Sequence, residues 1–240
     1  MSWGKEFDEE KLTEMITRKI RQEKIANKDV KMRTFITEDA GRNEMVQHVY
    51  DVTYGTVRPK QDTLVVIDDS IVRGTTLKES IIRMLARLKP KRIIIVSSSP
   101  QIRYPDCYGI DMSKMGDFIA FNAAVELMKE RGKMDCLKDL HNKCKELQRN
   151  NQLHTENVVK HLYKQFTAEE ISKKIAQLIT PPEVDIPVDV IFQRIEDLHK
   201  ACPNNLGDWY FSGDYPTPGG NRVVNKAFIN YMEGKNVRGY

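Results

Sequence analysis

The chain has 240 residues, of which 40% are hydrophobic and 30% are charged. Its 38 Lys and Arg residues nearly balance its 34 Asp and Glu residues, so charge alone indicates neither nucleic acid nor an anionic membrane as a partner. No run approaches the ~20 apolar residues that a membrane-spanning helix needs. The composition is typical of a globular protein with one or two domains, and it excludes a disordered tail and a membrane span.

The four cysteines, Cys107, Cys136, Cys144 and Cys202, lie far apart, and no two of them form a Cys-x-x-Cys pair. This spacing argues against a zinc ribbon and against a dithiol redox site. The first residues contain no signal-peptide core. We therefore expect free thiols and a cytoplasmic location.

Charged residues dominate the beginning of the chain. Leu12, Met15 and Ile16 recur at helical spacing within residues 5–27. This pattern predicts an amphipathic helix that covers another part of the protein.

The centre of the chain shows the clearest secondary-structure pattern. Residues 63–67 and 92–97 are short, β-branched runs, typical of strands that are buried on both faces. Between them, Leu77 and Leu85 mark one side of a helix that must end near Pro90. A strand, a helix and a strand in this order predict a βαβ unit with parallel strands and a right-handed crossover. The predicted fold class is α/β.

The pattern becomes mainly helical after residue 111. We expect helices near 118–132 and 188–200, and a third that begins with a capping box formed by Thr167 and Glu170. The predicted domain organisation is a helical lead segment at 1–32, a partial α/β domain at 33–130, and a mainly helical C-terminal region with a Pro/Gly/aromatic tail at 131–240.

The loop after the first strand begins with two carboxylates, Asp68 and Asp69. An ionised carboxylate accepts hydrogen bonds and does not donate them, so this pair suits a vicinal diol or a hard cation such as Mg²⁺. Strands often end in Asp for purely structural reasons, so the pair alone does not establish a site.

The second half of the same loop suits a phosphate. Gly74 allows a close backbone approach, and the helix that follows offers N–H groups and a positive dipole end. Ser70, Thr75 and Thr76 add hydroxyl donors, and Arg73 adds positive charge. Gly-Thr-Thr could also simply cap the helix. Taken together, the two halves of the loop predict a ribose 5-phosphate site. The loop is neither a Walker loop nor a dinucleotide fingerprint.

The string Asp-Asp-Ser-Ile-Val-Arg-Gly-Thr-Thr at 68–76 resembles the phosphoribosyl pyrophosphate (PRPP) motif of type I phosphoribosyltransferases. Its longer form is similar to glutamine phosphoribosylpyrophosphate amidotransferases, also called amidophosphoribosyltransferases. The likeness covers about 33–127, with a weaker echo at 211–217. Its flanking pieces are Arg33-Thr34-Phe35-Ile36, Arg42, Arg103-Tyr104-Pro105 and Tyr108-Gly109-Ile110-Asp111.

The resemblance implies a partial type I phosphoribosyltransferase core and a reaction in which ammonia displaces pyrophosphate from C1 of PRPP. The product is 5-phosphoribosylamine, in the first step of de novo purine biosynthesis. The resemblance also implies that Asp68 and Asp69 hold the ribose hydroxyls and Mg²⁺, and that no residue of this chain acts as a nucleophile. The implied PRPP-binding residues are Asp68, Asp69, Ser70, Ile71, Val72, Arg73, Gly74, Thr75 and Thr76.

The chain departs from that family in three places. The family's glutaminase uses an N-terminal cysteine, whereas this chain begins Met-Ser-Trp and its first cysteine is Cys107. The residues before Arg33 contain no counterpart of the pyrophosphate loop. The tail lacks Cys-x-x-Cys, so we expect no iron–sulfur cluster. We expect the C-terminal part of an amidophosphoribosyltransferase, or a truncated relative, that lacks glutaminase activity and full turnover by itself.

Several expectations about partners follow. The ligand is PRPP, ribose 5-phosphate or a purine nucleotide, and the protein partner is a glutaminase domain or the upstream part of the same enzyme. We expect a homo-oligomer that binds neither nucleic acid nor a membrane. Without upstream strands, the open edges of the sheet need a cover, and we expect the helix within 5–27 or a second chain to supply it.

Two alternatives stay open. One is a non-catalytic module that senses PRPP or a nucleotide. The other is an assembly subunit, which the aromatic cluster of Trp209, Tyr210, Phe211 and Tyr215 supports if it is exposed. We expect this cluster to pack on the core of its own chain instead.

Overall fold

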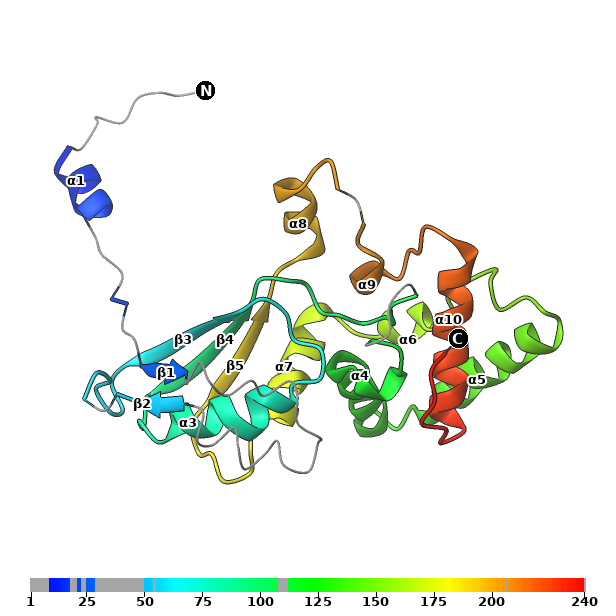
Figure 1. Cartoon of the computed structure of the whole chain (residues 1–240), viewed down its shortest axis with the longest axis horizontal. Helices are drawn as coiled ribbons and strands as arrows, with labels where there is room; N and C mark the ends of the chain where they lie inside the picture. The colour runs from blue at the N-terminus through cyan, green and yellow to red at the C-terminus, as the bar shows by residue number, and fades with distance from the viewer. Residues whose placement is uncertain are drawn as a thin grey trace.

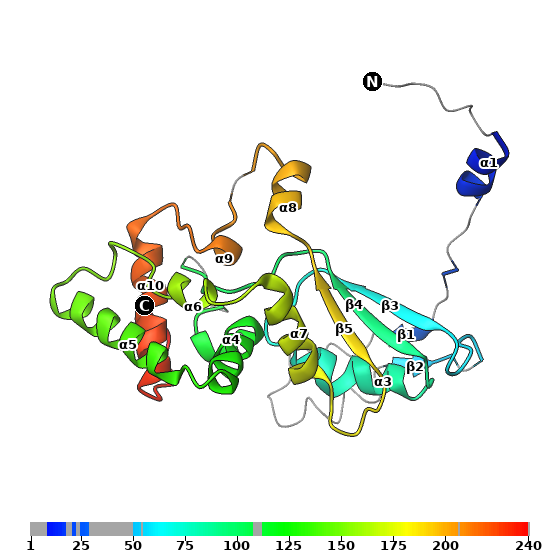
Figure 2. The same cartoon turned by 180° about the vertical axis from the view of Figure 1, so that it is seen from behind.

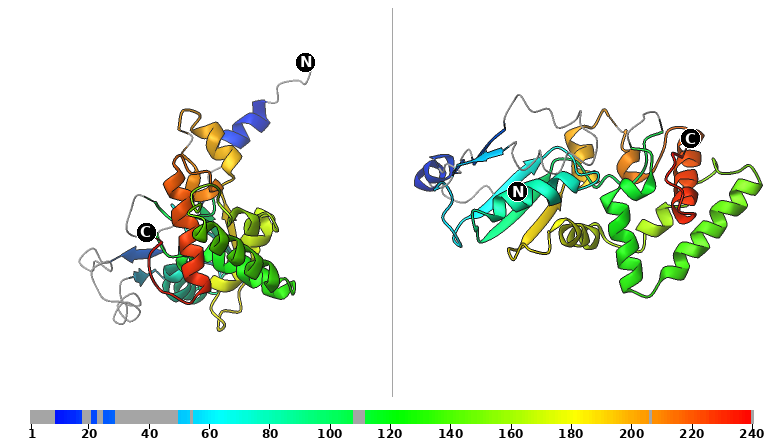
Figure 3. Two further views of the ribbon diagram at one scale, coloured as in Figure 1. Left: turned by 90° about the vertical axis from the view of Figure 1, so that its right-hand side faces the viewer. Right: turned by 60° about the horizontal axis from the view of Figure 1, so that its bottom comes forward.

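The computed structural model of the protein describes residues 9–17, 21–22, 25–28, 50–53, 55–107, 112–205 and 207–239. The sequence pieces 33–36 and 108–111 and the residue Arg42 lie outside this range. The main sheet lies toward one end of the molecule and a group of helices toward the other (Figures 1 and 3).

The main sheet has three parallel strands, in the order β3 (Thr63–Asp68), β4 (Arg92–Ser97) and β5 (Val188–Phe192). The first two strands pair in register over their full length, so both end at the same level. The helical segments η1 (Leu77–Ile81) and α3 (Ile82–Ala86) connect them. The predicted βαβ unit and the α/β class are confirmed.

Helices cover one face of this sheet. The connections β3 to β4 and β4 to β5 step in the same direction, so right-handed crossovers place α3 and α7 (Ala168–Ile179) on the same face. That face carries the buried side chains of Leu64, Ile93 and Ile95. Val65 and Ile67 point to the opposite face and are exposed. The prediction that the first strand is buried on both faces is therefore wrong.

The third strand was not predicted. Residues 188–192 form β5 along the outer edge of β4, and a helix, α8 (Ile195–Ala201), begins only afterwards. The predicted helix over 188–200 is therefore wrong in its first half. A short β-branched run satisfies its backbone by pairing with an available strand edge, which no local pattern reveals. The sheet thus includes a strand from beyond residue 130, and the predicted domain boundary there stays a prediction.

The helices at the other end form a packed group. They are η2 (Met115–Asp117), α4 (Ile119–Glu130), α5 (Met134–Arg149), α6 (Lys160–Tyr163), α9 (Trp209–Ser212) and α10 (Pro218–Met232). Phe121 of α4 lies edge-on to two rings of α10, with its ring centroid 6.2 Å from that of Phe228 and 4.8 Å from that of Tyr231. This confirms a mainly helical C-terminal region.

The capping box at the start of α7 is also confirmed. The Thr167 hydroxyl accepts the N–H of Glu170 at 3.1 Å, and the Thr167 N–H donates to Glu170 Oε2 at 2.8 Å. Two backbone donors that lack partners at a helix start are satisfied in this way. The cap positions α7, which packs against both α4 and β5.

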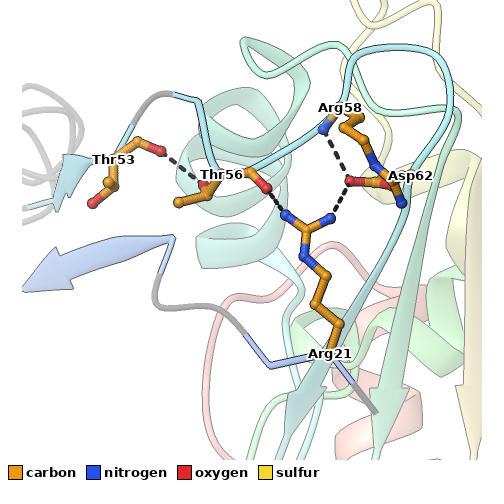
Figure 4. Close-up of polar contacts among 5 residues, drawn as sticks. All are labelled: Arg21, Thr53, Thr56, Arg58 and Asp62. Atoms are coloured by element: carbon orange, nitrogen blue, oxygen red, sulfur yellow. Dashed lines mark hydrogen bonds and ion pairs between the residues drawn. The ribbon is translucent and has the colours of Figure 1, made fainter. Parts of the chain in front are cut away.

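The lead segment contains α1 (Glu9–Thr17), followed by a small antiparallel pair, β1 (Ala26–Lys28) and β2 (Tyr50–Val52). The helix is shorter than the predicted range of 5–27. Arg21 connects this segment to the turn before β3, since its guanidinium bonds Asp62 and the carbonyl of Thr56 (Figure 4).

Two findings concern the expectations about the cysteines and about membrane-spanning helices. All four cysteines are thiols that are not joined in disulfides, as predicted. Among the helices that the structure describes, none has the length and apolar content needed to cross a membrane.

Candidate functional site

The site begins where β3 and β4 end side by side. Pairing continues past the strands, because the Ser98 N–H donates to the Asp68 carbonyl at 2.9 Å and the Ser99 N–H donates to the Asp69 carbonyl at 3.0 Å. The Ser98 hydroxyl also donates to the Asp68 carbonyl at 2.9 Å. These bonds hold the backbone of the acidic pair at the carboxyl end of the sheet, where open α/β sheets bind ligands.

The two carboxylates lie close together but in different surroundings. Asp69 is exposed, whereas Asp68 is half-buried and accepts the N–H of Asp69 on Oδ1 at 3.0 Å. Burial raises the pKa of Asp68 and repulsion from the Asp69 carboxylate adds to this, against the lowering effect of the hydrogen bond from the Asp69 N–H. The ionised form of Asp68 is therefore costly unless a hydroxyl donor or a cation approaches it.

Acidic oxygens of this kind are the ligands that Mg²⁺ prefers. In the described ranges no three or more His, Cys, Asp or Glu side chains come together as a metal cluster. Asp68 and Asp69 fit a Mg²⁺ ion that keeps several waters and also binds phosphate oxygens, the arrangement that this ion commonly adopts.

The phosphate half of the loop is anchored from behind. Ile71 is buried, and the carbonyl of Val72 accepts the N–H of Ile119, at the start of α4, at 2.8 Å. Gly74 has φ +71°, a conformation that favours glycine. A Cβ atom at this position would lie 2.8 Å from Cγ2 of Ile179, at the end of α7. The loop is thus held by two helices that follow it far along the chain.

The helix after the loop presents its N-terminus at the same place. Thr75 and Thr76 are exposed, and the Gly74 carbonyl accepts the N–H of Lys78 at 3.0 Å. The first N–H groups of a helix have no partner within the helix, so together with the dipole they attract an anion. The nine predicted residues of 68–76 therefore form one continuous segment from the last residue of β3 to the first helical turn, with acidic oxygens at one end and a helix N-terminus at the other.

Arg73 has an additional contact that the sequence did not reveal. Its Nη2 atom lies 3.1 Å from Oδ2 of Asp117 in η2, and both side chains are partly exposed. Exposed ion pairs contribute little to stability. The contact positions the guanidinium beside the loop and offsets part of its charge.

The flanking piece 103–105 and the aromatic tail come together. The N–H groups of Arg103 and Tyr104 donate to the Tyr210 carbonyl at 2.8 and 3.1 Å. The Tyr215 hydroxyl donates to the Pro105 carbonyl. Tyr210 and Tyr215 pack against the hydrophobic core, as does Phe211. The expectation that the aromatic cluster packs on its own chain is confirmed for these three residues.

A separate groove of about 1310 Å³ lies between α7 and β5. Gln101, Arg103, Ser172 and Phe192 are among the residues that line it, and it includes none of the residues 68–76. Sequence reasoning missed this groove, because it assigned residues 188–192 to a helix.

Several known proteins share sequence with part of this chain. No family model matches the chain. The amidophosphoribosyltransferase of Haemophilus influenzae is 42% identical over 71 residues, which are 30% of this chain and 14% of that protein. That of Pseudomonas aeruginosa is 39% identical over 95 residues, or 39% of this chain and 18% of the relative. The enzyme of Escherichia coli is 35% identical over 99 residues, or 41% and 19%.

The resemblance to amidophosphoribosyltransferases is confirmed. The matches span less than a fifth of the length of these amidophosphoribosyltransferases. A solved structure described as the glutamine PRPP amidotransferase of B. subtilis complexed with ADP and GMP aligns with 81% of this chain and 32% of that chain. Its sequence identity is 24% and its TM-score is 0.44.

Proposed function

We propose that the 68–76 loop binds the ribose 5-phosphate part of PRPP and that this chain forms the corresponding half of an amidophosphoribosyltransferase site. The proposal rests on one observation. Asp68 and Asp69 lie on the same short segment as the Gly74 turn and the N-terminus of the helix that follows. One small molecule that presents vicinal hydroxyls and a phosphate a few bonds apart matches both ends. The curated relatives support this assignment, because each is named an amidophosphoribosyltransferase.

The proposed roles follow from the donors and acceptors. Asp68 and Asp69 accept the ribose hydroxyls and hold Mg²⁺, which supplies neutralising charge for pyrophosphate when bound. The N–H groups of the 70–76 segment and the hydroxyls of Thr75 and Thr76 hold the 5-phosphate. The loop fixes the sugar so that ammonia can approach C1 as pyrophosphate leaves, and its contribution is positioning and electrostatics. Ammonia itself comes from a glutaminase domain outside the described residues.

Calorimetry with ribose 5-phosphate and with PRPP, each with and without Mg²⁺, tests this proposal. We expect both ligands to bind the full chain, and PRPP to bind more tightly with Mg²⁺. A lost hydrogen bond to a charged group costs ~1.5–3 kcal/mol, so Asp68→Asn and Asp69→Asn should each weaken binding about 10- to 100-fold. Asp185→Asn, an exposed acid away from the loop, is the matched control and should change nothing.

Two results would contradict the proposal. One is no binding of either ligand by the folded chain, and the other is equal binding by Asp68→Asn and Asp185→Asn. An assay for phosphoribosylamine separates catalysis from sensing. We expect no sustained product from PRPP and glutamine with this chain alone. Steady turnover under those conditions would disprove the part of the proposal that assigns glutaminase activity to another segment.

A further inference from the structure

One face of the main sheet exposes apolar side chains to solvent, beside an exposed ion pair between Arg92 of β4 and Asp189 of β5. The side chains of Val65 and Ile67 on β3 are 60% and 74% exposed, and that of Ile191 on β5 is 52% exposed. Ile67 pairs with Val96, and Val96 pairs with Ile191, so these side chains form one row across three strands. We call Val65, Ile67, Val96 and Ile191 the open face. Parallel sheets are almost always covered on both faces, and here α3 and α7 cover only the other one.

The helix α1 also exposes an apolar surface to solvent. Leu12, Met15 and Ile16 are 38%, 70% and 74% exposed. Their spacing of i, i+3 and i+4 places them along one side of the helix. None of the nine residues of α1 is buried. Because an isolated helix of this length is marginal in water, contact with another apolar surface would stabilise it.

The connection between α1 and the sheet is short and anchored. The Arg21 Nη1 atom lies 2.9 Å from Oδ2 of Asp62, directly before β3, and Figure 4 shows the guanidinium held between Asp62 and Thr56. Three residues lie between Thr17 and Arg21, so the four Cα-to-Cα steps that join them reach at most ~14 Å. Val65 lies three residues beyond Asp62, about 10 Å along the strand, so the open face is within reach of α1.

We propose that α1 docks on the open face of its own chain, with Leu12, Met15 and Ile16 against Val65 and Ile67. In the structure α1 is set apart from the strands (Figure 2), so docking requires the helix to move onto the face. A tether of three residues gives intrachain docking a high effective concentration, so a helix from the same chain is favoured over one from a second copy. The docked helix would shield both the face and the adjacent edge of β3.

A disulfide trap tests this arrangement in the full chain. Met15→Cys and Ile67→Cys are combined in a background that carries Cys107→Ser, Cys136→Ser and Cys202→Ser, which leaves only the buried Cys144 of the native thiols. The control combines Ile67→Cys with Glu14→Cys, which lies on the opposite side of α1. We expect an intrachain disulfide that forms about tenfold faster or more for the Met15 pair than for the Glu14 pair.

Two outcomes of the trap would overturn the proposal. Equal rates for the two pairs would show that α1 has no preferred side toward the sheet. A covalent dimer as the main product would place α1 on the sheet of a second copy.

Amide hydrogen exchange provides a second test that needs no engineered cysteines. We expect the backbone amides of 12–17 to exchange at least about tenfold more slowly than in an unstructured peptide, because α1 forms stably only when docked. Met15→Gln with Ile16→Gln should abolish this protection, and Thr13→Gln with Glu14→Gln should retain it. Unprotected amides in the unaltered chain, or equal protection in the two double variants, would overturn the proposal.

Discussion

Substitution of Gly74 by alanine tests whether the phosphate half of the loop is held as the structure shows. Gly74 has φ +71°, and an alanine in the left-handed region costs ~1–2 kcal/mol. Its Cβ would also lie 2.8 Å from Cγ2 of Ile179 and 3.5 Å from Cγ1 of Ile119. Ile179 is buried and cannot move freely, and overpacking of this kind costs ~1–3 kcal/mol. We expect Gly74→Ala to lower the free energy of unfolding by about 2–5 kcal/mol in total.

Gly132→Ala is the matched control, because Gly132 has φ +64° and open space around the position of a Cβ. This variant carries the backbone cost alone, about 1–2 kcal/mol. Urea unfolding followed by far-UV circular dichroism measures both variants. The double variant Gly74→Ala with Ile179→Leu should recover part of the loss, because leucine has no Cγ2 methyl group on its β-carbon.

The same variant has a functional consequence. Because the new methyl group pushes the loop away from α7, the N–H groups of residues 70–76 are displaced. We therefore expect weaker binding of ribose 5-phosphate by Gly74→Ala, with no change for Gly132→Ala. If the two glycine variants lose the same stability and bind equally well, the loop is not packed against Ile179 and the reasoning is wrong.

Three further predictions concern stability and thiol chemistry. Asn225→Leu should lower the free energy of unfolding by about 3 kcal/mol or more in urea titrations, because the Asn225 side chain forms hydrogen bonds with three backbone groups inside the protein and each group left unpaired costs ~1–3 kcal/mol. A loss below about 1 kcal/mol would contradict this prediction. Hydrogen bonds from two lysines lower the pKa of Glu233 to about 2. Its ionised form therefore stabilises the fold above pH ~4.5, and this contribution is lost as the pH falls toward 2. Glu233→Gln should have a lower free energy of unfolding than the parent at pH ~7 and match it near pH ~2, whereas a pH-independent difference would refute the assignment. Burial raises the pKa of Cys144 to about 12, so a thiol reagent at pH ~8 should modify the exposed Cys202 quickly and Cys144 only after unfolding; rapid reaction of Cys144 in the native protein would contradict its burial.

Most of the candidate site could be predicted from the sequence because its residues are contiguous. The string 68–76 contains both the acidic pair and the turn into the helix, so no long-range contact is needed to bring them together. The residues that support the loop gave no such signal. Ile119 and Ile179 hold it from α4 and α7, and Asp117 pairs with Arg73, but each is more than forty residues away in the chain.

The fold shows the same division. Within 63–97, a β-branched run, a turn and a helical pattern follow one another, and each is decided by neighbours a few residues away. The capping box of Thr167 and Glu170 is local in the same way. These elements agree with the structure because local preference and tertiary packing favour the same result.

The amino-acid sequence by itself determined the βαβ unit, the order of acidic and hydroxyl side chains in 68–76 and the likeness to amidophosphoribosyltransferases. Only the tertiary structure decided that residues 188–192 become a strand, because the free edge of β4 offers backbone partners that a helix in this segment would leave unused. It also decided that Val65 and Ile67 are exposed. Burial depends on which elements lie over a face, and the order and handedness of the crossovers place both covering helices on the opposite side.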